Sequence, residues 1–302
     1  MAVETVATPV GDAPGVSTVL GLGDRFGNWK SRWGIGRMKY AVAPGLYAVG
    51  NPSADSMVFV SANYKMSFDH LRSNLHGRDA WIMVLDTKGI NVWCAAGKGS
   101  FGTDEIVRRI ESTGLAEVVS HRKLILPQLG GPGVSAHEVK DRTGFRVIYG
   151  PIRAADIPAF LDAGLKVTTE MRLVRFGLYD RLVLIPVELV MSGKYLLAVA
   201  AALFVLSGLG RDLYSLDRVI SVGLPALLLL CAAYFAGGTL TPTLLPWLPG
   251  RSFALKGAVA GLVVVLIGGL YGGTRPVWPI GDWDTIAWAL MILSIASFIG
   301  MN

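Results

Sequence analysis

The sequence predicts a Rossmann-like α/β domain followed by an all-helical transmembrane domain. Of the 302 residues, 52% are hydrophobic and only 17% are charged, which is more apolar than usual for a soluble enzyme. Nearly all charged side chains precede about Lys194. Before that point short strand-like apolar runs alternate with helical patterns, and after it the apolar runs approach the roughly 20 residues that cross a bilayer.

Residues 1–45 are predicted to form an N-terminal arm that wraps the domain or stays loose, because they are rich in glycine and carry no sustained periodicity. They do not resemble a secretory signal. Glu4 stands where a basic region belongs, and proline and glycine interrupt the first apolar stretch. We therefore expect the α/β domain to stay in the cytoplasm.

Residues 46–170 carry the alternating pattern and are predicted to form the α/β domain. The predicted strands are 57–60, 81–85, 90–93, 123–126 and 145–149. The predicted helices are 67–75, a helix that begins with Thr103 as its N-cap, and 154–161. Strands that alternate with helices place ligand-binding loops at the strand ends.

Residues 171–302 are predicted to form about four membrane spans. The sequence stops at Met301-Asn302 without a polar anchor, which suggests truncation at the C-terminus. The apolar runs are 195–209, which lengthens if its helix starts near Val187, then 220–236, 255–271 and 283–301. The distribution of basic residues around them weakly favours a multi-pass protein of the cytoplasmic membrane with the α/β domain inside. No run has an ionisable residue at its centre, so an anchor or docking surface is favoured over a conduit.

Charge and cysteine content exclude two classes. The net charge is +6, but basic residues are scattered without a stripe or interleaved aromatic residues, so nucleic acid is not an expected partner. The two cysteines, Cys94 and Cys231, do not make a disulfide framework, since Cys231 lies in an apolar run. Cys94 is therefore free for another role.

The segment 91–98, with the sequence Asn-Val-Trp-Cys-Ala-Ala-Gly-Lys, is the chemical landmark of the chain. A phosphate-binding P-loop would need glycine at Val92 and serine or threonine at Gly99. A zinc site would need a cysteine partner at the right spacing, and none exists. The familiar cobalamin motif Asp-x-His-x-x-Gly also fails, because Phe68 stands two residues before His70.

Two interpretations of Cys94 remain at this point. A lone cysteine at a strand end is commonly a small buried hydrophobic residue. However, Ala95, Ala96 and Gly97 follow the bulky Trp93 and leave little side-chain volume, so a flat ligand can approach the backbone. A helix beginning here would also favour the thiolate form. A thiolate that faces a planar ligand suggests an axial metal bond.

At these residues the sequence resembles the mercury-methylating corrinoid proteins, the HgcA family. The family's motif is Asn-Val/Ile-Trp-Cys-Ala-Ala/Gly-Gly-Lys, and residues 91–98 match it at every position. The resemblance extends through 62–69, 127–133 and 179–184, and so covers most of the chain. A weaker similarity, at 86–89 and 95–98, is to the large subunit of the corrinoid iron-sulfur protein of acetyl-CoA synthesis, which lacks membrane spans.

The resemblance implies a corrinoid-binding domain at 46–170 with a cobalamin-type cofactor bound base-off. Cys94 would be the catalytic thiolate and the lower axial ligand of cobalt. The implied cap beneath the ring consists of Asn91, Val92, Trp93, Ala95, Ala96, Gly97 and Lys98, with further contacts from Asn63, Gly130, Gly131 and Gly133. The simpler alternatives are a solvated helix residue for Lys98, an N-cap for Asn63, and an ordinary turn for the glycines.

The implied function is a membrane-anchored, corrinoid-dependent methyltransferase that passes a methyl group from methyl-cobalt(III) to mercury(II). The implied partners are a methyltetrahydrofolate-linked methyl donor and a ferredoxin-like reductant with two 4Fe–4S clusters, which is also a candidate for mercury delivery. A separate reductant is needed because the chain has no cysteine set for a cluster. One alternative is a corrinoid methyl carrier of one-carbon metabolism with a non-mercury acceptor. Another is a non-catalytic membrane protein with an α/β sensor domain.

Overall fold

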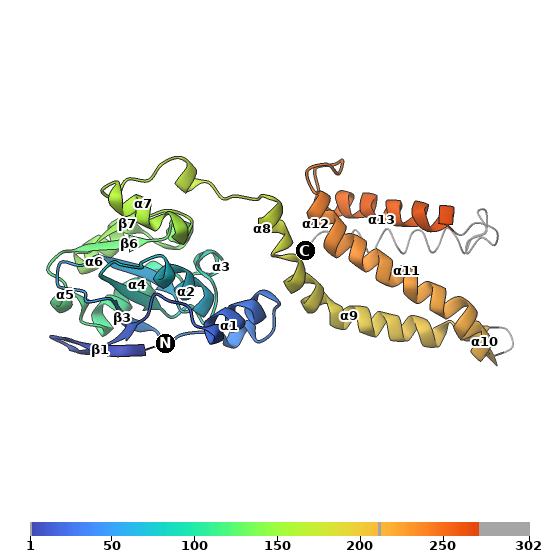
Figure 1. The fold of residues 1–302 in the computed structure, drawn as a ribbon, viewed down its shortest axis with the longest axis horizontal. Helices are drawn as coiled ribbons and strands as arrows, with labels where there is room; N and C mark the ends of the chain where they lie inside the picture. The colour runs from blue at the N-terminus through green and yellow to red at the C-terminus, as the bar shows by residue number, and fades with distance from the viewer. Residues whose placement is uncertain (1, 211–212, 272–302) are drawn as a thin grey trace. The chain divides into compact units, whose positions relative to one another are not determined.

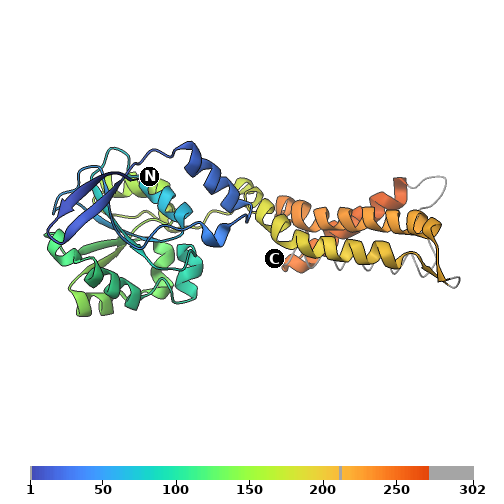
Figure 2. The same cartoon turned by 90° about the horizontal axis from the view of Figure 1, so that it is seen from below.

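The computed structural model describes residues 2–210 and 213–271, and the chain divides into two compact units (Figures 1 and 2). The first unit comprises Met1–Ser31 and Ile35–Val174, and the second comprises Arg32–Gly34 and Arg175–Asn302. The first is an α/β unit and the second is helical.

The α/β unit is built on one mixed sheet whose described strands follow the order β1-β2-β3-β5-β4-β6-β7 (Figure 1). The strands are β1 (Ala2–Thr8), β2 (Gly11–Val16), β3 (Gly45–Val49), β4 (Val58–Ala62), β5 (Ala80–Leu85), β6 (Lys123–Leu126) and β7 (Arg146–Tyr149). Strands β5, β4, β6 and β7 are parallel neighbours, whereas β3 pairs antiparallel with β5. The parallel strands confirm the predicted α/β class.

Both faces of the sheet are covered, which is why the central strands are almost wholly apolar. The helices of this unit are α1 (Leu22–Arg32), α2 (Lys65–Ser73), α3 (Val92–Gly97), α4 (Thr103–Ser112), α5 (Leu115–Val118), α6 (Ala136–Thr143) and α7 (Ile157–Asp162). Val58 and Val60 of β4 face a core shared with α3, α4 and α6, while Phe59 faces a core shared with α2 and α7. The period-two alternation of the strand therefore serves two cores.

Two predicted local features are wrong. Residues 90–93 are not a strand, because Asn91 caps the helix α3, which begins at Val92. Thr103 is not the N-cap of α4; that position is Gly102, and the Thr103 hydroxyl instead accepts a hydrogen bond from the backbone N–H of Ser135 at 2.9 Å. Both differences arise at helix starts, where several polar residues compete for the cap.

The predicted N-terminal arm is regular structure rather than a loose segment. Strands β1 and β2 form an antiparallel hairpin, and β2 joins the sheet through a parallel pairing of Gly15 with Ala48. Helix α1 follows, and a buried group of charges fastens it to α2. Asp24 of α1 lies 2.6 Å from the Lys65 ammonium and 2.8 Å from the Arg72 guanidinium.

This charge group predicts an acid-dependent contribution to stability. Burial raises the pKa of Asp24, but its hydrogen bonds with Lys65 and Arg72 outweigh that effect and hold the pKa at about 2, below the usual 3.8. A lowered folded-state pKa stabilises the unit above pH 3.8, and the contribution is lost as the pH falls through about 2. The melting temperature of the wild type should therefore exceed that of Asp24→Asn at neutral pH. The gap should close as the pH falls to about 2, and a constant gap would contradict this assignment.

The second unit is helical across its described residues. Its elements are α8 (Leu178–Leu182), α9 (Ile185–Leu206), a small hairpin of β8 (Leu209–Gly210) and β9 (Leu213–Tyr214), α10 (Leu216–Arg218), α11 (Leu224–Phe235), α12 (Thr241–Leu244) and α13 (Phe253–Tyr271). Two π-helical turns, Val219–Gly223 and Ala236–Leu240, join α10, α11 and α12 into one long helix. The Tyr234 hydroxyl, 2.9 Å from that of Ser192, links this helix to α9.

Among the described residues two helices are long and apolar enough to cross a membrane, Leu178–Leu206 and Leu216–Leu244. They correspond to the first two predicted runs. The third run forms α13, in which a shorter apolar stretch, Phe253–Val264, is found. The fourth predicted run, 283–301, lies outside the described residues. The described part thus contains two candidate spans, and the other two predicted spans stay predictions.

Candidate functional site

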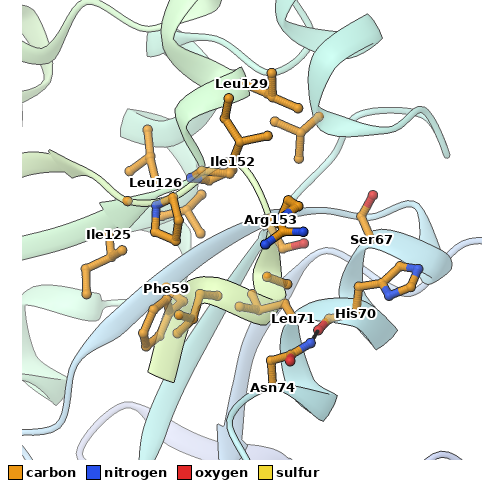
Figure 3. A pocket seen from close by; sticks show the side chains of 18 of the residues that line it. Phe59, Ser67, His70, Leu71, Asn74, Ile125, Leu126, Leu129, Ile152 and Arg153 are labelled. Carbon is orange, nitrogen blue, oxygen red and sulfur yellow. Dashed lines mark hydrogen bonds between the residues drawn. The ribbon is translucent and has the colours of Figure 1, made fainter. Parts of the chain in front are cut away.

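A cavity of about 490 Å³ opens at the carboxyl edge of the parallel strands (Figure 3). Its walls come from the ends of β4, β6 and β7 and from α2, α3 and α7. The carboxyl edge is where open α/β sheets bind ligands, because the loops that follow parallel strands gather there. Sequence analysis predicted ligand loops at strand ends, and the cavity lies at that edge.

The cavity is mainly apolar at its base and carries a few polar groups. Phe59, Ile125 and Leu126 come from the strands, and Leu129 and Ile152 come from the loops that follow them (Figure 3). Polar groups on α2 are Ser67, His70 and Asn74, and the Asn74 amide donates to the His70 carbonyl at 2.7 Å. Arg153 also lines the cavity, where its guanidinium pairs with Asp156 at 2.7 Å.

Helix α3 forms part of the cavity wall and carries the landmark segment. Asn91, Val92 and Trp93 line the cavity. The Asn91 side chain accepts a hydrogen bond from the backbone N–H of Cys94 at 2.9 Å, which fixes the first turn of the helix. Cys94 is exposed, so the interpretation of this residue as a buried hydrophobic side chain is wrong.

The two faces of α3 have different roles. Trp93, Cys94, Gly97 and Lys98 are exposed, and Trp93 retains 65% of its accessible surface. Ala95 and Ala96 are buried in the core shared with β4 and β5. The small side chains of these two alanines let α3 pack closely on the domain, and their predicted contact with the cofactor remains a prediction.

Asn63 does not face outward, and it is not the cap of α2, a position held by Tyr64. It is buried, and its side-chain oxygen accepts three hydrogen bonds, from the Thr87 N–H (3.1 Å), the Thr87 hydroxyl (2.8 Å) and the Gly89 N–H (2.9 Å). Lys88 and Gly89 both have positive φ, which is unfavourable for a residue with a side chain such as Lys88. The hydrogen bonds to Asn63 stabilise this turn. Asn63 thus positions the turn that leads into α3.

The glycines of the loop after β6 let this loop pack closely against α3. They belong to a 3₁₀ turn, Gln128–Gly133, that packs on the helix. A Cβ at Gly133 would collide with the Phe101 carbonyl oxygen and lie 3.0 Å from the Ala96 Cα. A Cβ at Gly130 would meet the Phe101 ring at 2.5 Å. The structure thus gives Gly130 and Gly133 a packing role, and their predicted cofactor contact remains a prediction.

This packing predicts different effects for two neighbouring glycines. Gly133→Ala should force the 3₁₀ turn away from α3 and cost about 1–3 kcal/mol, as overpacking of a tight contact does. Gly131→Ala is the matched control, because its Cβ would meet only Tyr149 at 3.8 Å. Thermal unfolding of the two variants should show a clear loss for Gly133→Ala alone. Equal losses would contradict the close approach of the turn to the helix.

Sequence reasoning missed the cavity residues on α2 and α7. Ser67 lies in the segment 62–69 that the resemblance covers, whereas His70 follows that segment and was considered only as a metal ligand. The available signal was positional, since α2 directly follows β4 and so borders its carboxyl edge. Arg153 likewise follows β7 and so borders the carboxyl edge of that strand. Within the described residues no group of three or more His, Cys, Asp or Glu side chains is placed to hold a metal ion.

Comparison with known proteins relates the α/β unit to subunits of acetyl-CoA-forming complexes. The family model "CO dehydrogenase/acetyl-CoA synthase delta subunit" matches residues 36–161, less than half of the chain. Subunit gamma of the acetyl-CoA decarbonylase/synthase complex from Archaeoglobus fulgidus is 32% identical over 128 residues, 42% of this chain and 27% of the relative. The same subunit of Methanocaldococcus jannaschii is 32% identical over 127 residues, 41% of this chain and 26% of the relative.

The chain thus spans about a quarter of the length of these curated relatives. The matched region contains β3 to β7, α3 and the cavity. The comparisons support the resemblance to the corrinoid protein of acetyl-CoA synthesis. The resemblance to mercury-methylating proteins continues to rest on the motif at 91–98.

Proposed function

We propose that the α/β unit binds a corrinoid and that the chain acts as a corrinoid methyl carrier of one-carbon metabolism. The observation that carries this proposal is the exposed Cys94 thiol on α3, one residue from Trp93 in the wall of the cavity. The similarity to subunits of the acetyl-CoA decarbonylase/synthase complex supports the same class.

The residues present fit a large planar group. The position that a Cβ would occupy at Gly97 has no atom within 4 Å, so the surface one turn after Cys94 is open. The exposed Trp93 ring adds a broad apolar surface on the other side of the thiol. The adjoining cavity of about 490 Å³ adds room for a peripheral part of the ligand.

In this proposal the Cys94 thiolate would hold the cobalt, and Trp93, Gly97 and Lys98 would border the ring. Asn91 holds the first turn of α3, and Asn63 holds the preceding turn, so both position the thiol. When bound, a corrinoid supplies the cobalt that accepts and gives up the methyl group, while the protein supplies the ligand and its orientation. A thiolate is a soft ligand, and such a metal centre accepts soft ligands.

A reductant is a further part of the proposal. The electrons that reduce the corrinoid would come from a partner that carries 4Fe–4S clusters. This chain cannot hold such a cluster itself, because it has only two cysteines and Cys231 lies within the apolar helix α11. The relatives are named as subunits of a complex, which supports a protein partner. The methyl donor proposed is a methyltetrahydrofolate-linked one-carbon pathway.

We further propose that the second unit anchors the chain in the cytoplasmic membrane, with the α/β unit in the cytoplasm. The apolar 18-residue stretch of Leu178–Leu206 has no buried residue, although its mean hydropathy is 2.1. A helix that is hydrophobic all round and yet uncovered is typical of a membrane span. The helix Leu216–Leu244, with mean hydropathy 2.2, supports a second crossing.

Mercury(II) as the methyl acceptor is a second candidate function. The complete match of residues 91–98 to the motif of mercury-methylating corrinoid proteins favours it. The one other cysteine within the described residues is Cys231, which lies in the apolar helix α11. Mercury(II) would therefore arrive bound to a small thiol or to the partner.

One experiment separates the two functions. The full chain, purified anaerobically with a cobalamin-type corrinoid, is first examined by visible spectroscopy for base-off corrinoid and then given a methyl donor, an iron–sulfur reductant and thiol-bound mercury(II). Corrinoid binding without methylmercury supports the carrier. Corrinoid binding with catalytic methylmercury formation supports the mercury methyltransferase. A chain that binds no corrinoid under these conditions contradicts both.

A further inference from the structure

Helix α1 has the reverse of the usual arrangement of polar and apolar side chains. Leu22, Phe26 and Trp29 recur at the spacing of one helical face and are 87%, 60% and 48% exposed. Phe26 and Trp29 stack on one another with ring centroids 5.8 Å apart. A helix on a soluble domain normally turns such a stripe toward the core, and an exposed apolar stripe is typical of a contact surface.

The polar side of α1 faces the domain. Asp24 pairs with Lys65 and Arg72, and Ser31 is buried with its hydroxyl 2.6 Å from that of Tyr64. These contacts fix the rotation of the helix about its axis. The outward position of the apolar stripe is therefore built into the fold and does not result from a loosely attached helix.

The charges that remain at the surface of this segment are positive. Residues 22–39 contain one acidic residue, Asp24, which the ion pairs with Lys65 and Arg72 occupy. The same segment contains five basic residues, Arg25, Lys30, Arg32, Arg37 and Lys39. The ammonium of Lys30 lies 5.9 Å from the centre of the Phe26 ring. Aromatic residues bordered by lysine and arginine are the pattern of helices that lie in the interface of an anionic membrane.

We propose that α1 is an interfacial membrane contact of the α/β unit, with its apolar stripe inserted among anionic lipids. Charge complementarity selects anionic lipid over a neutral apolar protein surface, because anionic headgroups attract basic residues that border the stripe, such as Arg25 and Lys30. The inference is independent of corrinoid binding. It draws on the proposed anchoring only in that the same chain would already be near a bilayer.

The test uses the full chain with Cys94→Ser and Cys231→Ala, into which single cysteines are introduced for an environment-sensitive fluorophore. Phe26→Cys is the probe, Leu22→Cys is a second probe on the same stripe, and Glu111→Cys on α4 is the matched exposed control. The protein is reconstituted in vesicles of phosphatidylcholine with or without phosphatidylglycerol. Lipids that carry a quencher near the headgroup report the depth of each label.

We expect the labels at 22 and 26, but not at 111, to be quenched in anionic vesicles. Arg25→Glu should reduce the interfacial population about fivefold or more, since each basic residue near the surface is worth about that factor. Labels at 22 and 26 that stay in water, in a chain that floats with the vesicles, would overturn the proposal while leaving the anchoring intact. Failure to float would overturn both. Shielding of the labels only by an added protein or by a second copy would show a protein-docking helix and would also overturn it.

Discussion

Replacing Cys94 with alanine is expected to remove cobalt–sulfur ligation and to lower corrinoid-dependent methyl transfer by more than about 100-fold. Loss of residues that merely support a metal ligand costs about 10–100-fold, and loss of the ligand itself should exceed that range. The exposed thiol on α3 is the reason to expect so local an effect. Ala95 and Ala96, not Cys94, pack in the core, so the fold should survive the substitution.

Cys231→Ala is the matched control, since the second cysteine lies in α11 of the other unit. Its visible spectrum with bound corrinoid and its rate of methyl transfer should equal those of the wild type. Circular dichroism of both variants should match the wild type as well. Similar losses at both positions would refute Cys94 as the sole functional thiol.

Asp69→Ala is expected to produce the largest loss of stability, about 3–5 kcal/mol, because it leaves the buried Arg72 with Asp24, which is only partly buried, as its remaining counter-charge. The side chains of Asp69 and Arg72 are both fully buried, and they lie 2.8 Å apart. Asp69 also lies 2.7 Å from the Lys65 ammonium, so two cations lose a counter-charge. Thermal unfolding of the α/β unit within the full chain, followed by near-ultraviolet circular dichroism, measures the effect.

Two further variants separate the burial of a charge from the loss of an ion pair in general. Asp69→Leu combined with Arg72→Met should recover much of the stability, since it removes both buried charges together. Asp162→Ala breaks the more exposed pair with Arg78 and should cost only about 0–1 kcal/mol. If Asp69→Ala is no worse than Asp162→Ala, the charge group is not buried as described.

Much of the sheet was predictable because its strands carry their own pattern. Strands β4, β5, β6 and β7 fall within one or two residues of the apolar runs that predicted them. Their short length and the intervening helical periodicity leave few alternative folds. Strand β3 and the β1–β2 hairpin were missed because they lie in glycine-rich sequence, where pairing with the sheet edge, rather than local pattern, determines the structure.

The site was predictable in the residues of the motif 91–98, but not in its geometry or in the cavity residues of α2 and of the segment after β7. The motif at 91–98 pointed to Cys94, and the structure places that thiol at the surface. Small residues do not reveal which way they face, so Ala95 and Ala96 were assigned to the ligand although they pack in the core. Asn63 was unpredictable for a similar reason, because its partners Thr87 and Gly89 are more than 20 residues away.

Helix α1 shows another limit of pattern analysis. Its apolar residues are spaced helically, but seven glycines from residue 11 to residue 36 obscure the pattern. Nothing local indicates that Asp24 faces inward, since that depends on Lys65 and Arg72 from α2. Long-range ion pairs fixed the rotation of this helix, and local periodicity did not.

We propose above all that the Cys94 sulfur binds the cobalt of a corrinoid. X-ray absorption at the cobalt edge tests it directly, with wild type and Cys94→Ser loaded with the same corrinoid and frozen anaerobically. The wild type should show one sulfur scatterer in the first coordination sphere of cobalt, and Cys94→Ser should show only nitrogen and oxygen. A wild-type cobalt surrounded by nitrogen and oxygen alone, and indistinguishable from the variant, would contradict the account.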